Sequence, residues 1–322
     1  MQDERQDMAA DGAHTGDRTE AQPAVSGTAS VGPTVPARRP ATSLLTWGTV
    51  ALVLVIVVVL VVIKLTGTPT APTSSAPPPP VPASPTIVHA ITSIPASVYD
   101  AIGITSPDAA VTPPTLLHGQ ALLSRVGKPE VLFVGNEFCP YCAAERWALV
   151  AALSRFGTFS VLDQIQSGSN EAFPSTPTFT FSGAHYASKY IAVDLVEHYS
   201  DEKNGAGTAY AILQHLTSQE RSLMAKYDRT TPGAPRGVVP FVDVANQAVV
   251  AGGSFSPSIF QQLSVADIAN GLTDPKDPAT QAIVASANYL SAVICRADGQ
   301  QPSHVCASHG VAAAARGLHL AP

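Results

Sequence analysis

The sequence VLFVGNEFCPYCAAERW, residues 131–147, governs how the rest of the chain is interpreted. Residues 131–134 form an apolar run with two valines and a phenylalanine, which favours a buried strand. Cys139, Pro140, Tyr141 and Cys142 follow, and after them comes a segment rich in Ala, Leu and Arg, residue types that favour a helix. The stretch therefore predicts a strand, a turn that carries two cysteines, and a helix.

The two cysteines have different expected roles because they occupy different helix positions. Cys139 stands where an N-cap is expected, and Pro140 suits the first helical position, where the missing N–H has no intrahelical partner anyway. The unsatisfied N–H groups and the positive dipole end of the helix favour a thiolate, which lowers the pKa of Cys139. Cys139 is therefore the expected nucleophile, and Cys142 is expected to resolve a mixed disulfide.

A Cys-x-x-Cys motif between a strand and a helix resembles the thioredoxin superfamily. The longer string CPYCAAERW resembles the signature of a membrane-anchored thioredoxin-like family that is classed as a domain of unknown function. The resemblance covers most of the chain after about Ile87. It implies an α/β thioredoxin-like fold with a helical insert and a redox site without an organic cofactor, but no established substrate. Pro140 and Tyr141 complete the active-site motif; the same dipeptide occurs in glutaredoxins, which does not imply glutathione binding.

The resemblance also implies a substrate groove at Val239 and Pro240. Thioredoxin-like proteins place a cis-proline before the strand that faces the dithiol, and the order and context of Val239–Pro240 match that position. The backbone of the residue before the proline is then free to pair with an extended substrate. The alternative is an ordinary proline at a strand start, because residues 241–244 and 248–251 predict a hairpin around a turn at residues 245–247.

An uncharged apolar run begins at Ala41 and ends at Ile63, and it is long enough to cross a bilayer as a helix. We interpret it as an uncleaved transmembrane anchor, with a cleaved secretory signal as the alternative. Arg38 and Arg39 precede the run and Lys64 follows it, so the positive-inside bias places the N-terminus in the cytoplasm. The protein is thus expected in the cell membrane as a single-pass protein with an extracytoplasmic C-terminal domain.

The chain divides into five expected parts. They are a disordered cytoplasmic tail at residues 1–40, a transmembrane helix at residues 41–65, a Pro-rich linker at residues 66–86, a thioredoxin-like domain at residues 87–309 and a flexible C-terminal tail at residues 310–322. Within the domain, helices are expected at residues 116–125, up to about residue 154 after the dithiol, within residues 209–227 and 257–263, and at residues 277–295. Strands are expected at residues 159–165 and, as two pieces, within residues 178–199.

Cys295 and Cys306 lie beyond the expected catalytic fold and suit a structural disulfide. A second redox pair that relays electrons to the dithiol is the alternative. All four cysteines follow the apolar run, which suits an oxidising compartment. A net charge of −6 without a basic patch argues against a nucleic-acid partner.

Other polar residues of the domain are given structural interpretations. Glu145 and Arg146 are expected on a solvated helix face, with tuning of Cys142 or contact with a partner as the alternative, and Trp147 is expected in the core. His185 and His198 have no close ligand partner in the sequence, so we expect no metal site there.

Three functions fit these observations. The first is a membrane-tethered thiol–disulfide oxidoreductase that acts on protein thiols or disulfides and exchanges electrons with a membrane redox partner. The second is a non-catalytic thioredoxin-like binding or scaffold module in which Cys139 and Cys142 form a structural disulfide. The third, copper or zinc handling by the two sulfurs and a histidine, suffers from a shortage of ligands.

Overall fold

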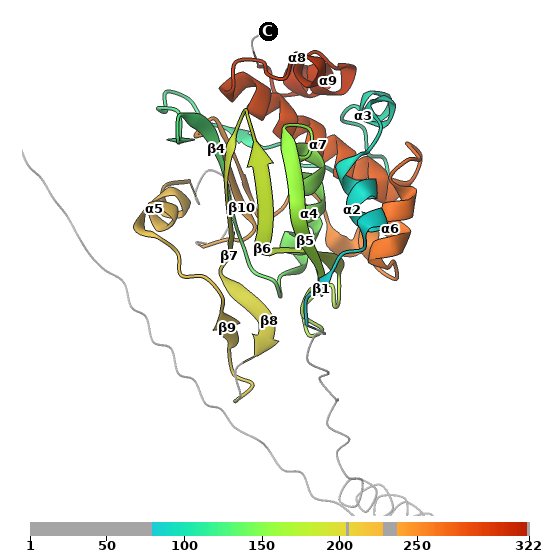
Figure 1. The fold of residues 1–322 in the computed structure, drawn as a ribbon, viewed down its shortest axis with the longest axis vertical. Helices are drawn as coiled ribbons and strands as arrows, with labels where there is room; N and C mark the ends of the chain where they lie inside the picture. Colours follow the sequence, from blue (N-terminus) through green and yellow to red (C-terminus); the bar gives the residue numbers. More distant parts are fainter. Residues whose placement is uncertain (1–78, 204–205, 228–236, 321–322) are drawn as a thin grey trace, which may run out of the picture. The chain divides into compact units, whose positions relative to one another are not determined.

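The computed structural model describes residues 79–203, 206–227 and 237–320, which form a mixed α/β fold (Figure 1). The predicted cytoplasmic tail, the predicted anchor from Ala41 to Ile63 and most of the predicted linker lie outside these residues. No helix in the described part of the chain is long and apolar enough to cross a membrane.

The described residues form both strands and helices, with the strands β5 to β9 consecutive in the chain. The strands are β1 (Val81–Pro82), β2 (Thr115–Leu116), β3 (Ser124–Arg125), β4 (Lys128–Gly135), β5 (Gly157–Gln166), β6 (Pro177–Ser188), β7 (Ala192–Glu197), β8 (Tyr199–Lys203), β9 (Tyr210–Ile212), β10 (Phe241–Val244) and β11 (Ala248–Ala251). The helices are α2 (Pro85–Thr92), α3 (Ala96–Ile102), α4 (Pro140–Leu153), α5 (Ser218–Tyr227), the 3-10 helix η1 (Pro257–Phe260), α6 (Val265–Gly271), α7 (Pro278–Ala297), α8 (Ser303–Cys306) and α9 (His309–Gly317).

The strand predicted at residues 131–134 is confirmed as the centre of the main sheet. It belongs to β4, which pairs in parallel with β7 and antiparallel with β10. The predicted hairpin is also confirmed, because β10 pairs with β11, and β11 in turn pairs with β2. Val131 and Val134 are each 1% exposed, as expected of a strand that is covered on both faces.

A second sheet contains β1, β5 and β6 in that order. The strand predicted at residues 159–165 is β5, and the two extended pieces predicted within residues 178–199 are β6 and β7. In Figure 1, β5 and β6 stand beside β7, with α4 behind them. The chain therefore leaves β4, passes through α4 and the β5–β6 hairpin, and returns as β7 beside β4.

Helix α4 is the most buried helix of the described structure, and it carries the dithiol at its N-terminus. Every residue from Cys142 to Leu153 is buried, because α4 packs against α7 on one side and against β6 on another. The prediction that Trp147 belongs to the core is confirmed: its Nε1 donates a hydrogen bond to Pro177 O at 3.0 Å. The predicted helix at residues 277–295 is confirmed as α7, with Asp277 as its N-cap.

Three helix predictions need correction. Residues 116–125 form no helix, because Thr115–Leu116 pairs with β11 and Ser124–Arg125 pairs with β4. Of residues 209–227 only the second half is helical: Tyr210–Ile212 is strand β9, whereas Thr217 and Glu220 form a capping box before α5. The helix expected at residues 257–263 ends at Phe260 as the 3-10 helix η1, and α6 follows separately.

Both predicted ends of the domain are wrong. The fold begins before Ile87, because Val81–Pro82 pairs with β5 and Ser84 caps α2; the proline-rich composition concealed this strand. The C-terminal tail predicted at residues 310–322 is helix α9 from His309 onward, with Val311 and Ala314 buried against α7. Its small residues allow close packing: a Cβ at Gly310 would lie 2.6 Å from Tyr99 O, which explains the glycine.

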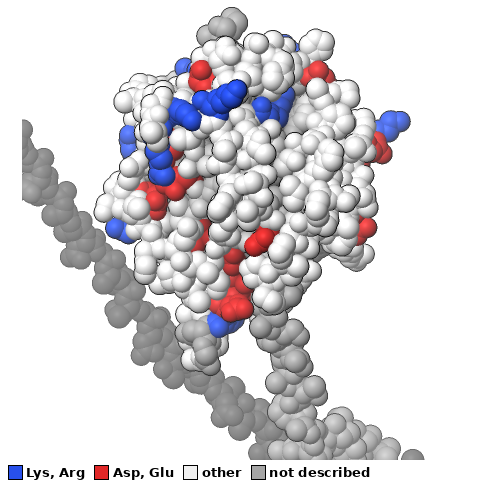
Figure 2. All heavy atoms as spheres, viewed as in Figure 1, with Lys and Arg blue, Asp and Glu red and all other residues white. Residues whose placement is uncertain are grey.

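Charged side chains make up only 13% of the chain. Figure 2 accordingly shows one face on which small groups of acidic and basic residues are separated by wide uncharged areas. Because charges are scarce, the places where they gather or are buried are informative.

Candidate functional site

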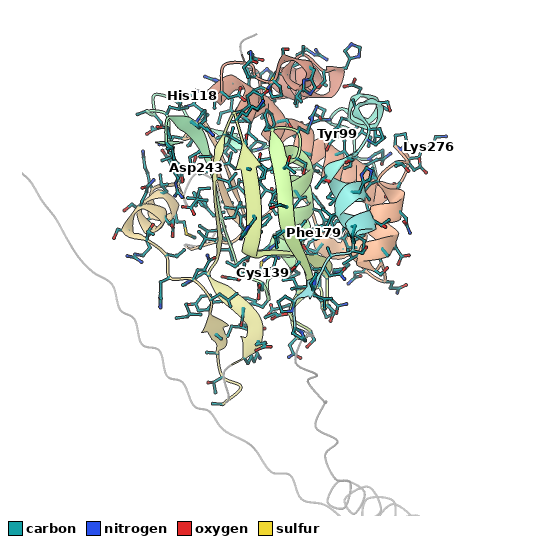
Figure 3. All side chains as sticks on the ribbon, in the orientation of Figure 1. Tyr99, His118, Cys139, Phe179, Asp243 and Lys276 are labelled. Carbon is teal, nitrogen blue, oxygen red and sulfur yellow. A yellow bond between two sulfur atoms is a disulfide. The ribbon has the colours of Figure 1, made fainter. Side chains whose placement is uncertain are left out.

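The two free cysteines are Cys139, which lies at the lower end of the main sheet in the view of Figure 3, where β4 leads into α4, and Cys142 in the first turn of α4. Cys139 is 7% exposed and Cys142 is fully buried. The N-cap position predicted for Cys139 is observed, and Pro140 is the first residue of α4. The sequence therefore folds locally as expected, with only Cys139 within reach of solvent.

Hydrogen bonds around Cys139 favour its thiolate. The backbone N–H of Cys142 donates to Cys139 Sγ at 3.2 Å. The pKa of Cys139 is lowered, first by a hydrogen bond from the Cys142 thiol and then by the Cys142 N–H and by the positive charge of Arg146. Burial and the same thiol–thiol hydrogen bond raise the pKa of Cys142 well above its usual range. The surroundings therefore favour a thiolate at Cys139 and a protonated thiol at Cys142.

The loop before β10 reaches the dithiol from the other side. The Val239–Pro240 peptide bond is cis, as the family resemblance implied, and Val239 O lies 3.9 Å from Cys139 Sγ. Val239 is half-buried and Pro240 is buried. The structure thus brings the pair Cys139 and Cys142 together with the pair Val239 and Pro240, about a hundred residues further along the chain.

Aromatic side chains surround the dithiol. Tyr141 is 38% exposed and meets Phe173 edge to face, with ring centroids 5.8 Å apart. Phe138, next to Cys139, stacks on Tyr210 with centroids 3.9 Å apart. Gly253 has φ +89, and a Cβ there would lie 3.4 Å from the ring of Tyr141, so the chain after β11 also approaches the motif closely.

A buried ion pair lies one helical turn beyond Cys142. Arg146 donates two hydrogen bonds of 2.7 Å to Glu197, and neither side chain is exposed. Its Nη2 also donates to Asn136 O at 2.9 Å, the carbonyl that accepts from the N–H of Cys139. Residues four apart share a helix face, so Arg146 and Cys142 lie on the same side of α4. Arg146 therefore holds a fixed positive charge beside both sulfurs.

The solvated helix face predicted for Glu145 and Arg146 is wrong. Glu145 is fully buried and accepts hydrogen bonds from Ser254 N at 2.8 Å and Ser254 Oγ at 3.1 Å, which ties the chain after β11 to α4. The rule that helical charges face water fails because α4 is covered all round. The sequence did contain a signal for this burial: apart from Glu145 and Arg146, every residue from Ala143 to Leu153 is apolar, so the helix has no polar face.

Two further acids that sequence reasoning missed lie near Arg146. Burial raises the pKa of Glu137 to about 7, although a hydrogen bond from Thr180 Oγ1 at 2.5 Å opposes this shift. Burial also raises the pKa of Asp201 to about 6. Arg146 acts electrostatically on both carboxyl groups and lowers their pKa values. The site therefore combines one arginine with three buried carboxyl groups, Glu137, Glu197 and Asp201.

Replacing Glu137 with Gln should raise stability at alkaline pH. The pKa of Glu137 is about 7 in the folded chain and about 4.3 in an unfolded one, so folding favours the protonated acid. That stabilisation is complete below about pH 4 and is lost as the pH rises through 7. Since glutamine cannot ionise, Glu137→Gln should exceed the parent in free energy of unfolding by about 1–3 kcal/mol at about pH 8, and match it below about pH 4.

Denaturant unfolding at both pH values measures this difference. Glu202→Gln, at an exposed position of β8, is the matched control and should change the free energy of unfolding by less than about 0.5 kcal/mol at either pH. An equal loss of stability in Glu137→Gln at both pH values would contradict the assigned titration.

The remaining sequence candidates lie apart from the dithiol or serve other contacts. Cys295 and Cys306 form a disulfide that joins α7 to α8, which agrees with the predicted structural pair. His198 makes a hydrogen bond between Nδ1 and Gln214 O at 2.7 Å. Within the described ranges, no group of three potential ligand side chains is arranged to hold a metal ion.

Comparison with known proteins identifies one match. A family model described as "Domain of unknown function (DUF929)" matches residues 118–296, more than half of the chain and nearly all of the structure from β3 to α7. None of the curated proteins and none of the solved structures matches significantly.

Proposed function

This chain belongs to the DUF929 family, and we propose that it is a thiol–disulfide oxidoreductase of thioredoxin-like fold that acts on protein substrates through Cys139 and Cys142. The environment of Cys139 carries the proposal. Its sulfur accepts a hydrogen bond from the Cys142 N–H at the start of α4 and lies beside the carbonyl oxygen of Val239. Cys139 is 7% exposed, whereas Cys142 is fully buried.

The arrangement of the elements supports the thioredoxin-like fold. Strand β4, helix α4 and the parallel strand β7 form a βαβ unit, and the antiparallel hairpin of β10 and β11 followed by α7 completes the order expected of such a fold. The β5–β6 hairpin and the segment from β8 to α5 are then insertions. The helical insert expected from the sequence corresponds to α5, preceded by the β8–β9 hairpin.

The reaction would run in two exchanges. The Cys139 thiolate attacks one sulfur of a substrate disulfide, and the other substrate sulfur leaves as a thiolate that takes up a proton. Cys142 then loses its proton and attacks Cys139 Sγ in the mixed disulfide, which releases the second substrate thiol. The protein dithiol is oxidised to a disulfide while the substrate gains two electrons and two protons. The reverse sequence oxidises a substrate dithiol.

We also propose that the anchor between Ala41 and Ile63 tethers this domain to the outer face of the cell membrane, with the N-terminus in the cytoplasm. The disulfide between Cys295 and Cys306 supports this location, because structural disulfides persist in oxidising compartments. A membrane redox partner would then restore the dithiol or the disulfide after each turnover.

Redox equilibration tests the proposal. The full-length protein in mild detergent is incubated in graded glutathione buffers, and mass spectrometry quantifies the Cys139–Cys142 disulfide separately from Cys295–Cys306. A potential between about −120 and −180 mV would identify a disulfide donor or isomerase, and one near about −270 mV a reductant. A Cys139–Cys142 pair that neither opens nor closes across the series would contradict the proposal and favour the binding module.

A further inference from the structure

Two segments flank the dithiol and are held to it by direct contacts. The first is the loop between β5 and β6, where Gly168 N donates to Phe138 O at 2.8 Å. The second is the β8–β9 hairpin, where Tyr210 stacks on Phe138. The two segments also contact each other, because the Tyr210 hydroxyl donates to Glu171 Oε1 at 2.9 Å. Both segments are therefore fixed beside Cys139 and are available to contact whatever reacts there.

These segments carry carboxylates. Glu171 lies on the loop and Glu202 lies on β8; we call these two residues the acidic rim, and Asp201, also on β8, is buried next to Glu202. Figure 2 shows acidic side chains gathered at the lower centre of the molecule, and Figure 3 places Cys139 in the same region. Lys203 ends β8, and its Nζ lies over the ring of Tyr210 at 5.4 Å. The edge of the rim that faces solvent therefore carries the two negative charges of Glu171 and Glu202 against the one positive charge of Lys203.

The charges beneath the rim do not cancel it. Arg146 is already bound by Glu197, and Glu137 is buried beside the pair. Asp201 is 3% exposed, and its Oδ2 has no hydrogen-bond partner within the described residues. An acceptor that is buried without a donor is costly, and an ammonium or guanidinium group that reached it would remove that cost. This unsatisfied oxygen is a second observation, independent of the rim, that points to a cationic ligand.

Aromatic faces and open backbone complete the surface. Tyr141 is exposed beside Phe173, and aromatic rings attract Lys and Arg side chains through their faces. Val239 O lies beside Cys139 Sγ, where the backbone of an extended segment would pass. The surface therefore combines an acceptor for backbone N–H groups with aromatic and acidic contacts for basic side chains.

We infer that the protein substrates of this site present their reactive cysteine in an extended segment with Lys or Arg beside it. This inference rests on the proposed function and specifies its substrate class. In the reaction, Cys139 Sγ forms a bond to the sulfur of the substrate cysteine. The disulfide bond between that sulfur and its partner sulfur breaks, and the partner sulfur leaves with the electron pair as a thiolate. The basic neighbours of the substrate cysteine pair with the acidic rim and raise the rate of encounter.

The test compares three peptides that differ only in the two residues flanking a single cysteine: Lys, Gln or Glu. Each cysteine carries the same aromatic thiol in disulfide linkage, so its release as a coloured thiolate reports attack by the reduced full-length protein in detergent. The Lys peptide should react about 10- to 100-fold faster than the Glu peptide at low salt. The ratio should shrink to a few-fold at about 1 M salt, where the Debye length is about 3 Å.

Variants assign the preference to the rim. The double variant Glu171→Gln with Glu202→Gln should lower the Lys-to-Glu rate ratio by roughly 3- to 10-fold. The first of these substitutions keeps an amide oxygen that can accept from the Tyr210 hydroxyl, so the contact between the two segments is retained. Asp108→Asn is the matched control: it removes one exposed negative charge from the loop after α3 and should leave the ratio unchanged.

Three outcomes are distinguishable. A cationic preference that falls in the double variant supports the inference. Equal rates for all three peptides, or a preference that the double variant retains, overturn the inference but leave the oxidoreductase intact. Absence of reaction with every peptide, and with a small neutral disulfide, overturns the proposed function together with the inference.

Discussion

Replacing Arg146 with Met is expected to lower the free energy of unfolding by about 3–5 kcal/mol. The Arg146 and Glu197 side chains are both fully buried, and the guanidinium also acts electrostatically on Glu137 and Asp201. Removing it leaves Glu197 charged in an apolar interior or forces the acid to take up a proton. Denaturant unfolding measures the loss.

The same substitution should alter the dithiol. The positive charge of Arg146 is one cause of the lowered pKa of Cys139, so Arg146→Met should raise that pKa. The pH dependence of Cys139 alkylation reports this change independently of stability. A merely structural role for Arg146 would destabilise the fold and leave the alkylation profile in place.

Two control variants show whether the loss of stability in Arg146→Met comes from its buried charge. Arg146→Met combined with Glu197→Gln removes both charges, and its cost should fall below the sum of the single variants by about 1–3 kcal/mol. Arg125 forms ion pairs with Glu130 and Asp194; its own side chain is 45% exposed and that of Asp194 is 20% exposed, whereas that of Glu130 is 3% exposed. Because the Arg125 guanidinium is hydrated and only one of its two partners is buried, Arg125→Met should cost less than Arg146→Met, about 1–2 kcal/mol. A comparable cost for both arginines would contradict the buried charge assignment.

Replacing Cys139 with Ser should lower the rate of exchange with a small neutral disulfide by about 10³-fold or more, equivalent to about 4 kcal/mol of activation free energy. Cys142 cannot substitute for the lost thiolate, since it is fully buried and its pKa is raised well above the usual range. Stopped-flow or quenched-flow measurement of the released thiol gives the rate.

Cys142→Ser should behave differently from Cys139→Ser. The backbone N–H that donates to Cys139 Sγ remains, and a serine hydroxyl can still donate a hydrogen bond, so the first attack should slow by less than about 10-fold. Without a resolving thiol, the mixed disulfide at Cys139 should accumulate, with one substrate thiol released per protein. Mass spectrometry identifies this species; its absence under conditions where the parent reacts would contradict the order of attack.

The sequence predicted the fold best where local chemistry alone determines the structure. The strand at residues 131–134, the N-cap at Cys139 and the helix at residues 277–295 follow from local sequence patterns, and all three are present. Residues 116–125 were misassigned for two reasons: Leu116 pairs with β11 far along the chain, a contact that overrides a helical pattern, and Ser124–Arg125 turns back at Val126 and Gly127 to pair with the start of β4. The same holds for Val81–Pro82, whose partner β5 lies about eighty residues away.

The candidate site was predicted in part for the same reason. The dithiol is a local motif, and the resemblance supplied Val239 and Pro240 as its distant companions. Glu137, Glu197 and Asp201 belong to three different segments, and no spacing in the sequence indicates that they share one arginine. Arg146 itself was assigned to a solvated face because average helices are covered on one side, whereas α4 is covered on all sides.

The family match ends at residue 296, between the two partners of the disulfide that joins α7 to α8. It begins at residue 118, after α2 and α3. A chain shortened to these limits would lose α3 and α9, which both pack on α7, and would expose the outer side of that helix. It would also leave Cys295 as an unpaired third thiol that competes with the dithiol for oxidation. A protein meant for redox measurements must therefore extend from before Val81 to beyond Gly317, although the family match lies entirely between those limits.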